Sequence, residues 1–400
     1  MMAQAVDFNI TPELRGELRG VRTKALILGV LGAAASAAGF FMEGPNQFYR
    51  SYLWSFLYVL ALSLGPLTWL VLQYVTGGAW GVITRRSCEA AARTLPLVAV
   101  MFLPIVIGIN NLYPWAHANL VAADPLLQHK APYLNLPFFL GRAAFYFAGW
   151  LFLGWWFNHW SAKEDTLGHE AVHSKMSRMA GPGLLFIGFS VTFMAVDWIL
   201  SVDPKWFSTI FGLLCIVSQN LTAMAFLIAL MVFLSARKPM SDIITHRHLH
   251  DMGKFMLALV MVWAYFSFSQ FLIIWAGNLP EEIPWYIARL NHGWQYVALA
   301  LVFGHFALPF ALLLSRDLKR NFKLLGSIAV FILLMRFVDL YWLITPGFRK
   351  DSFGVSWLDF TVPIGLVGLW LAWFLTQLEK RSLIPPHALH LEETLAHGRE

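Results

Sequence analysis

Apolar residues form long, nearly uninterrupted runs along the chain, separated by short segments rich in charged residues, proline and glycine. Each run has the length of about 20 residues that a helix needs to cross the hydrocarbon core of a membrane. Continuous runs of this length predict helices, because strands of a barrel would show short alternating segments. We expect ten spans, at residues 24–42, 52–76, 93–112, 138–160, 182–202, 207–235, 253–277, 289–315, 322–345 and 356–378.

The composition agrees with an all-α polytopic membrane protein. Hydrophobic residues make up 58% of the 400 positions and charged residues only 13%, whereas a soluble protein carries about 25% charged residues. The pattern divides the chain into a cytoplasmic segment at 1–23, a ten-helix transmembrane domain at 24–378 and a cytoplasmic tail at 379–400. Glu13 and Glu17 precede the first apolar run, which is unlike the basic start of a cleaved signal peptide.

The distribution of basic residues predicts the orientation. Most of the 29 Lys and Arg residues fall in the amino-terminal segment, the tail and the even-numbered connections, where Arg85 and Arg86 are examples. Such residues concentrate on the cytoplasmic side, so both termini should be cytoplasmic. The net charge of +6 reflects this bias and gives no indication of nucleic-acid binding. All connections are short, so any extramembrane partner must be a separate protein.

Ionisable residues within the spans are the first place to look for function, because burying a charge in a membrane is costly. Arg336 and Asp339 are three residues apart on one helical face, and form either a self-neutralising pair or a site where Asp339 exchanges protons. Asp197 lies deep in the fifth span and is a second proton-path candidate. Asp203 precedes Pro204 and fits either a helix cap or the same path. His305 could relay protons or only bond across helices.

The histidines and cysteines argue against a redox centre in this chain. A two-haem cytochrome needs paired axial histidines on facing helices, but His292 and His305 share one predicted span, and no other span offers a matching pair. Cys88 and Cys215 are placed in a predicted connection and a predicted span, which leaves no thiolate cluster. We expect no haem, iron or other metal on this chain.

One run stands out at residues 196–212, from Val196-Asp197-Trp198 to Ile210-Phe211-Gly212. It resembles the NrfD/polysulfide-reductase-like membrane subunits of alternative complex III, and is the most specific such match. Similar stretches cover most of the chain: Leu64-Gly65-Pro66, Gln73-Tyr74-Val75-Thr76-Gly77-Gly78-Ala79-Trp80 with Arg85-Arg86, Tyr133-Leu134-Asn135 with Phe138, Phe139, Arg142 and Tyr146, His305-Phe306 with Pro309-Phe310, and Arg336 with Asp339-Leu340-Tyr341-Trp342 and Pro346.

The resemblance is closest to the shorter, ActF-type paralogue and implies two four-helix bundles, with the first and last spans peripheral. It implies a bacterial cytoplasmic membrane, and as partners lipids, a paralogous NrfD-like subunit, an iron–sulfur protein and c-type cytochromes. The complex would oxidise quinol, whose pocket is generally given to the longer paralogue. Arg142 and Tyr146 are the candidates for a quinone contact in this chain.

The sequence thus predicts a subunit of a quinol-oxidising respiratory complex that has no catalytic site or redox centre of its own. It would contribute a proton half-channel and a docking platform for periplasmic subunits. Two alternatives stay open, a secondary transporter and a purely structural subunit. A transporter would typically show paired broken helices around a midplane site.

Overall fold

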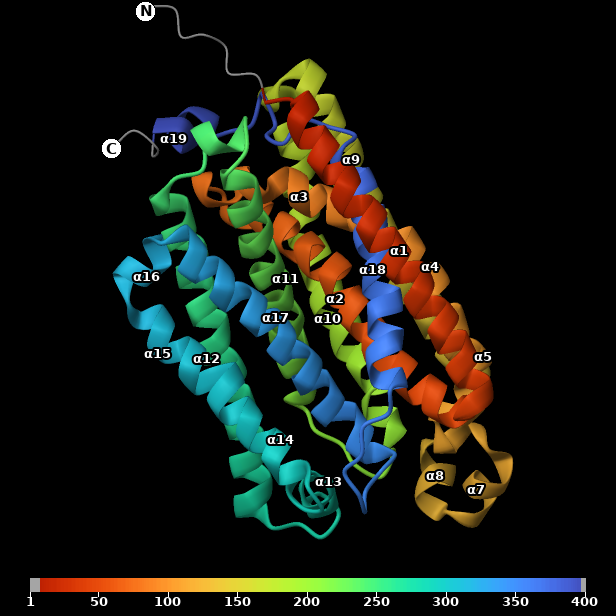
Figure 1. Cartoon of the computed structure of the whole chain (residues 1–400). Helices are drawn as coiled ribbons and strands as arrows, with labels where there is room; N and C mark the ends of the chain where they lie inside the picture. Colours follow the sequence, from red (N-terminus) through yellow and green to blue (C-terminus); the bar gives the residue numbers. More distant parts are fainter. Residues whose placement is uncertain (1–7, 397–400) are drawn as a thin grey trace, which may run out of the picture.

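A computed structural model describes residues 8–396 as a bundle of helices (Figure 1). Ten helical segments of the described chain are long and apolar enough to cross a membrane, which confirms the prediction of a multi-pass all-α protein. Their bounds are α1 (Pro12–Met42), α2 (Pro45–Thr76), α3 (Val82–Ala92) with α4 (Leu95–Met101) and α5 (Leu103–Ile107), α9 (Leu136–Leu167), α10 (His169–Trp198), α11 (Phe211–Ser235), α12 (His246–Gly277), α14 (Trp294–Ala300) with α15 (Leu308–Leu314), α17 (Phe322–Ile344) and α18 (Leu358–Leu378).

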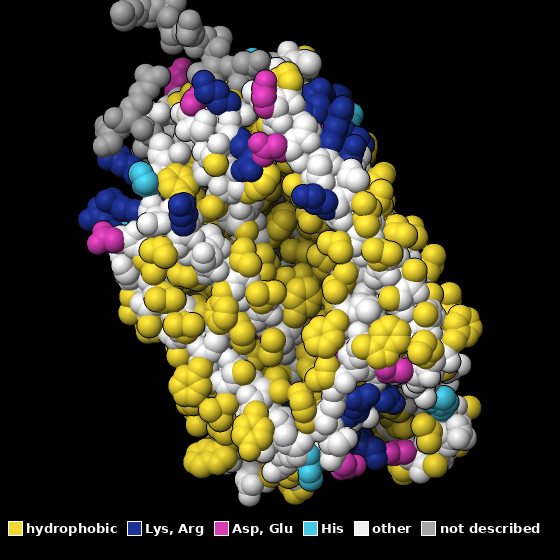
Figure 2. All heavy atoms as spheres, viewed as in Figure 1, with side chains coloured by type: hydrophobic (Ala, Val, Ile, Leu, Met, Phe, Trp, Pro, Cys, Tyr) yellow, Lys and Arg dark blue, Asp and Glu magenta, His cyan; other side chains and the backbone are white. Residues whose placement is uncertain are grey.

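Short helices occupy the connections. They are α6 (Ile109–Leu112), α7 (Ala118–Ala123), α8 (Pro125–Lys130), α13 (Ile283–Leu290), α16 (Arg316–Arg320) and α19 (Leu391–Ala396). We call the end of the bundle where α1 begins and α18 ends the terminal end, and the end with α7, α8 and α13 the loop end (Figure 1). Apolar side chains cover the middle of the molecule and charged ones gather towards the two ends (Figure 2), as expected for a protein that crosses a bilayer.

Side-chain caps fix several helix starts. Thr11 accepts a hydrogen bond from the backbone N–H of Leu14 at the start of α1, and Asn135 does the same from Phe138 at the start of α9. Both helices also have proline in the first turn, where its missing N–H costs nothing. A capping residue followed by proline in the first turn therefore marks where each of these helices begins.

Helix α2 is almost entirely buried and forms the centre of the fold. It packs with α3–α4, α9 and α10 in one group of helices, and contacts α11 of a second group that contains α12, α14–α15 and α17. Helices α1 and α18 pack on each other beside these two groups. Their contact is close because glycines meet: a Cβ atom on Gly32 would lie 2.5 Å from the backbone nitrogen of Gly365.

The helical segment that carries the third span begins earlier than the predicted residue 93. Arg85, Arg86 and Cys88, expected in the connection before this span, lie in α3, within a helical segment that runs from Ala79 to Ile107. The two arginine side chains are almost fully buried. They tolerate burial because Glu89 of α3 and two carboxylates of α9 neutralise them, and a count of basic residues along the chain does not reveal this pairing.

Candidate functional site

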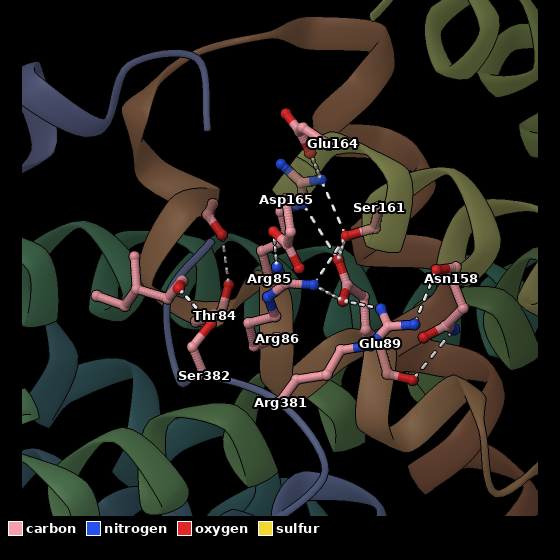
Figure 3. Close-up of polar contacts among 12 residues, drawn as sticks. Thr84, Arg85, Arg86, Glu89, Asn158, Ser161, Glu164, Asp165, Arg381 and Ser382 are labelled. Carbon is pink, nitrogen blue, oxygen red and sulfur yellow. Dashed lines mark hydrogen bonds and ion pairs between the residues drawn. The ribbon is translucent and has the colours of Figure 1, made fainter. Parts of the chain in front are cut away.

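A network of buried charges lies at the terminal end (Figure 3). We call it the terminal ion network and define it by its three arginines, three acidic residues and one serine: Arg85, Arg86, Arg381, Glu89, Glu164, Asp165 and Ser161. The side chains converge from α3, from the last turns of α9 and from the segment that follows α18 (Figure 3). Three positive and three negative groups balance, so the network carries no formal net charge.

Glu89 is the hub of the terminal ion network. It is fully buried and accepts hydrogen bonds from Arg85 Nε at 3.2 Å, Arg86 Nη1 at 2.7 Å, Arg381 Nη1 at 3.2 Å and Ser161 Oγ at 2.5 Å. Arg85 and Arg86 reach it because they lie four and three residues earlier on one face of α3. A carboxylate can accept this many donors because it presents two oxygens with several lone pairs.

The rest of the terminal ion network joins α3 to α9. Arg85 pairs with Glu164 and Arg86 pairs with Asp165. His169, the first residue of α10, places its Nδ1 atom 2.8 Å from the other oxygen of Glu164. The His169 side chain is 18% exposed and that of Arg381 is 23% exposed, whereas Glu89 and Glu164 are buried. The network therefore reaches from the buried hub to the surface of the terminal end.

A second site surrounds Asp197 at the loop end. The carboxylate is completely buried in the last turn of α10 and accepts hydrogen bonds from Arg142 Nε and Nη2, both at 2.8 Å, and from the Tyr146 hydroxyl at 2.7 Å. The ring of Tyr133 stacks on the guanidinium, with Arg142 Cζ 3.8 Å from the ring centroid. Burial and the nearby Asp197 carboxylate both raise the pKa of Tyr133. The structure thus joins three residues that the sequence presented separately, Asp197 as a proton-path candidate and Arg142 and Tyr146 as quinone candidates.

Arg336 and Asp339 form the intrahelical pair expected from their spacing on α17. Both side chains are buried, and Arg336 Nε also donates to Thr222 Oγ1 of α11 at 3.1 Å. Asp339 lies five residues before the end of α17, which corresponds to about 7–8 Å of helix. The pair is therefore inside the bundle, nearer to the loop end than to the terminal end.

His305 is fully buried in a π-helical turn, Leu301–Ala307, that interrupts the eighth span between α14 and α15. Neither ring nitrogen has a hydrogen-bond partner within residues 8–396. The ring packs on Trp263 of α12 at a centroid distance of 4.2 Å. A buried imidazole without partners is costly, and π-helical turns often occur at functional sites.

Asp203 lies in the turn after α10 rather than within the bundle. Its carboxylate accepts a hydrogen bond from the exposed Lys350 Nζ at 3.0 Å, and its carbonyl accepts the Trp206 N–H. In the part of the chain that the structure describes, no hydrogen bond links Asp203, His305, Asp339 and Asp197 into one path.

The terminal ion network is the feature that the sequence analysis missed. Its signal was present in the i, i+3 and i, i+4 spacing of Arg85, Arg86 and Glu89, and in the pattern Ser161, Glu164 and Asp165 near the end of the fourth span. Among the described residues, no group of three or more His, Cys, Asp and Glu side chains is gathered as a metal site would require.

Comparison with protein-family models finds no match, and comparison with curated proteins finds no relative.

Proposed function

We propose that this chain is a membrane subunit of a bacterial quinol-oxidising respiratory complex of the alternative complex III type. It has no redox centre of its own and contributes a proton half-channel and a platform for periplasmic iron–sulfur and cytochrome c subunits. The resemblance described above supports the choice of complex. The observation that carries the proton half-channel is the set of buried titratable groups at different depths: Glu89 and Glu164 at the terminal end, His305 and Asp339 within the bundle, and Asp197 at the loop end.

The half-channel proposal requires water or side-chain movement between these groups. His305 supports this requirement, because its two unpaired ring nitrogens offer one donor and one acceptor to a bridging molecule. The π-helical turn around it is a second sign of a site that is not purely structural.

A purely structural subunit is the second candidate, and one observation favours it. Asp197 and Asp339 are each held by an arginine, and the terminal ion network is charge-balanced, as in a framework that only holds helices together. The transporter alternative has less support. Two spans are interrupted, α3–α5 and α14–α15. The first is the second span of the group that begins with α2, and the other is the third span of the group that begins with α11. Paired broken helices of a transporter would instead lie at corresponding positions in the two groups.

The orientation has a direct test, with the terminal end placed in the cytoplasm. The described native cysteines, Cys88 and Cys215, are buried and should give little background. A cysteine introduced at Lys254, at the terminal end, should react with an impermeant maleimide only after cells are opened. A cysteine at Lys205, between α10 and α11 at the loop end, should react in intact spheroplasts. The reverse pattern would overturn the proposed orientation.

The assignment to a respiratory complex is tested by purification under mild conditions with an affinity tag on this chain. A paralogous NrfD-like membrane protein, an iron–sulfur protein and c-type cytochromes should co-purify, and the preparation should oxidise quinol. After the partners are removed, the remaining chain should show no visible haem absorption. Purification of the chain alone, or haem that stays with it, would contradict the proposal.

A further inference from the structure

A groove of about 730 Å³ opens on the face between α17 and α18, with α1 and α2 also contributing to its wall. The space-filling view shows this hollow in the middle of the apolar face (Figure 2). Its volume lies within the range of about 300–1,000 Å³ that small-molecule sites occupy. Aliphatic residues line most of its length, including Leu334 and Val338 on α17 and Ile364, Val367 and Leu371 on α18. An apolar groove of this kind suits a long hydrocarbon chain that enters from the bilayer.

The groove is polar at one end only. Asp359, in the first turn of α18, lines it at the loop end. Its Oδ1 atom accepts from Ser51 Oγ at 2.6 Å and Gln47 Nε2 at 3.4 Å, whereas within residues 8–396 Oδ2 accepts one hydrogen bond, from the Ser356 N–H at 2.9 Å. A carboxylate oxygen can accept two donors, so Oδ2 retains capacity for one more. This end therefore suits a ligand head that donates a hydroxyl hydrogen.

Aromatic rings form the wall beside Asp359. Trp54, Phe337, Tyr341 and Phe353 all line the groove. Trp54 meets Phe337 and Tyr341 edge to face, at centroid distances of 6.1 and 5.9 Å. Its buried indole N–H has no hydrogen-bond partner in residues 8–396. Rings of this kind bind flat aromatic groups through stacking and edge contacts.

From these three features we infer that the groove binds an isoprenoid quinol. The hydroxylated ring lies among the aromatic residues near Asp359, and the isoprenoid chain follows α18 towards Leu371. A phospholipid fits less well, because among the described residues that line the groove the formally charged one, Asp359, is acidic, and Arg349 nearby already bonds Gln47 and the Gly354 carbonyl. This site is separate from Arg142 and Tyr146: the Tyr146 hydroxyl and Arg142 Nε and Nη2 donate to Asp197, and Arg142 Nη1 donates to the Tyr133 carbonyl. The choice of quinol rests on the proposed function.

The test uses the purified full chain in lipid nanodiscs and a ubiquinol analogue with a photoreactive diazirine on its chain. After illumination, mass spectrometry should find the label on peptides of α17 and α18, and unlabelled ubiquinol should compete for it. Ile364→Trp fills the groove and should lower labelling about tenfold. Val330→Trp is the matched control, because Val330 is equally exposed, at 48%, but does not line the groove. It should label like the unmodified chain.

Equal labelling of Ile364→Trp and Val330→Trp would overturn the inference, provided that both variants elute as single folded species. So would competition by added phospholipid but not by ubiquinol, which would make the groove a lipid site. This binding experiment needs neither partner subunits nor turnover. The labelling can therefore fail while co-purification succeeds, and co-purification can fail while the labelling succeeds. The failure of the quinol site and the failure of the proposed function are therefore distinguishable.

Discussion

Replacing Glu89 with Gln should destabilise the protein strongly. The carboxylate is fully buried and receives hydrogen bonds from three arginines and Ser161. Without its charge, the three guanidinium groups of the terminal ion network face only Glu164 and Asp165. Removing one partner of a buried ion pair typically costs about 3–5 kcal/mol, since the remaining charge stays in a low dielectric. We expect a large fall in the yield of folded protein and in its thermal midpoint.

Glu17→Gln provides the control for this prediction. Glu17 pairs with Arg237 at the same end of the molecule, but its side chain is 50% exposed. An exposed pair contributes at most about 1 kcal/mol, so this variant should fold and melt almost like the unmodified chain. Fluorescence-detected size exclusion and thermal unfolding in detergent measure both effects. If Glu89→Gln were as stable as Glu17→Gln, the terminal ion network would not hold α3, α9 and the tail together.

Replacing Asp339 with Asn should abolish proton movement while the complex still assembles. The amide keeps the size of the carboxylate and an oxygen that accepts from Arg336, but it cannot exchange protons near neutral pH. Arg336 also stays bonded to Thr222 of α11, which limits the structural damage. If Asp339 serves only as the counter-charge of Arg336, the same substitution should lower the yield instead, because a buried guanidinium is left without compensation.

Two further variants extend this comparison to other depths. Asp197→Asn changes the buried group at the loop end, and His305→Gln changes the unpaired imidazole in the π-helical turn. If these groups form a continuous proton path, proton uptake should fall in all three variants. If Arg336 and Asp339 form only a local ion pair, the effects should be confined to substitutions of these two residues.

The helical architecture could be predicted because it depends on local properties of the sequence. Apolar runs of membrane-spanning length predict the ten spans, and a polar residue one or two positions before a proline, as at Thr11 and Asn135, marks where a helix begins. The pair Arg336–Asp339 was also accessible, because three residues along a helix place two side chains on one face. Each of these inferences uses only neighbours in the chain.

The other sites depend on contacts between distant segments. Arg142 and Asp197 are 55 residues apart, and Arg381 lies 292 residues from Glu89. Arg85 and Arg86 fit the expected excess of basic residues on the cytoplasmic side, and their spacing to Glu89 does not by itself reveal that Glu164, Asp165 and Arg381 complete a buried network. The groove is lined by residues of α1 and α2 together with residues of α17 and α18, which lie far apart in the sequence, so no local pattern specifies it.

Quinol-driven proton uptake by the purified complex in sealed vesicles tests the central claim most directly. Complex yield, electron transfer and proton uptake are measured on the same preparations of the unmodified and Asp339→Asn proteins. The proposed half-channel predicts normal yield with loss of proton uptake in the variant. Normal yield with unchanged proton uptake would remove Asp339 from any proton path and contradict the account.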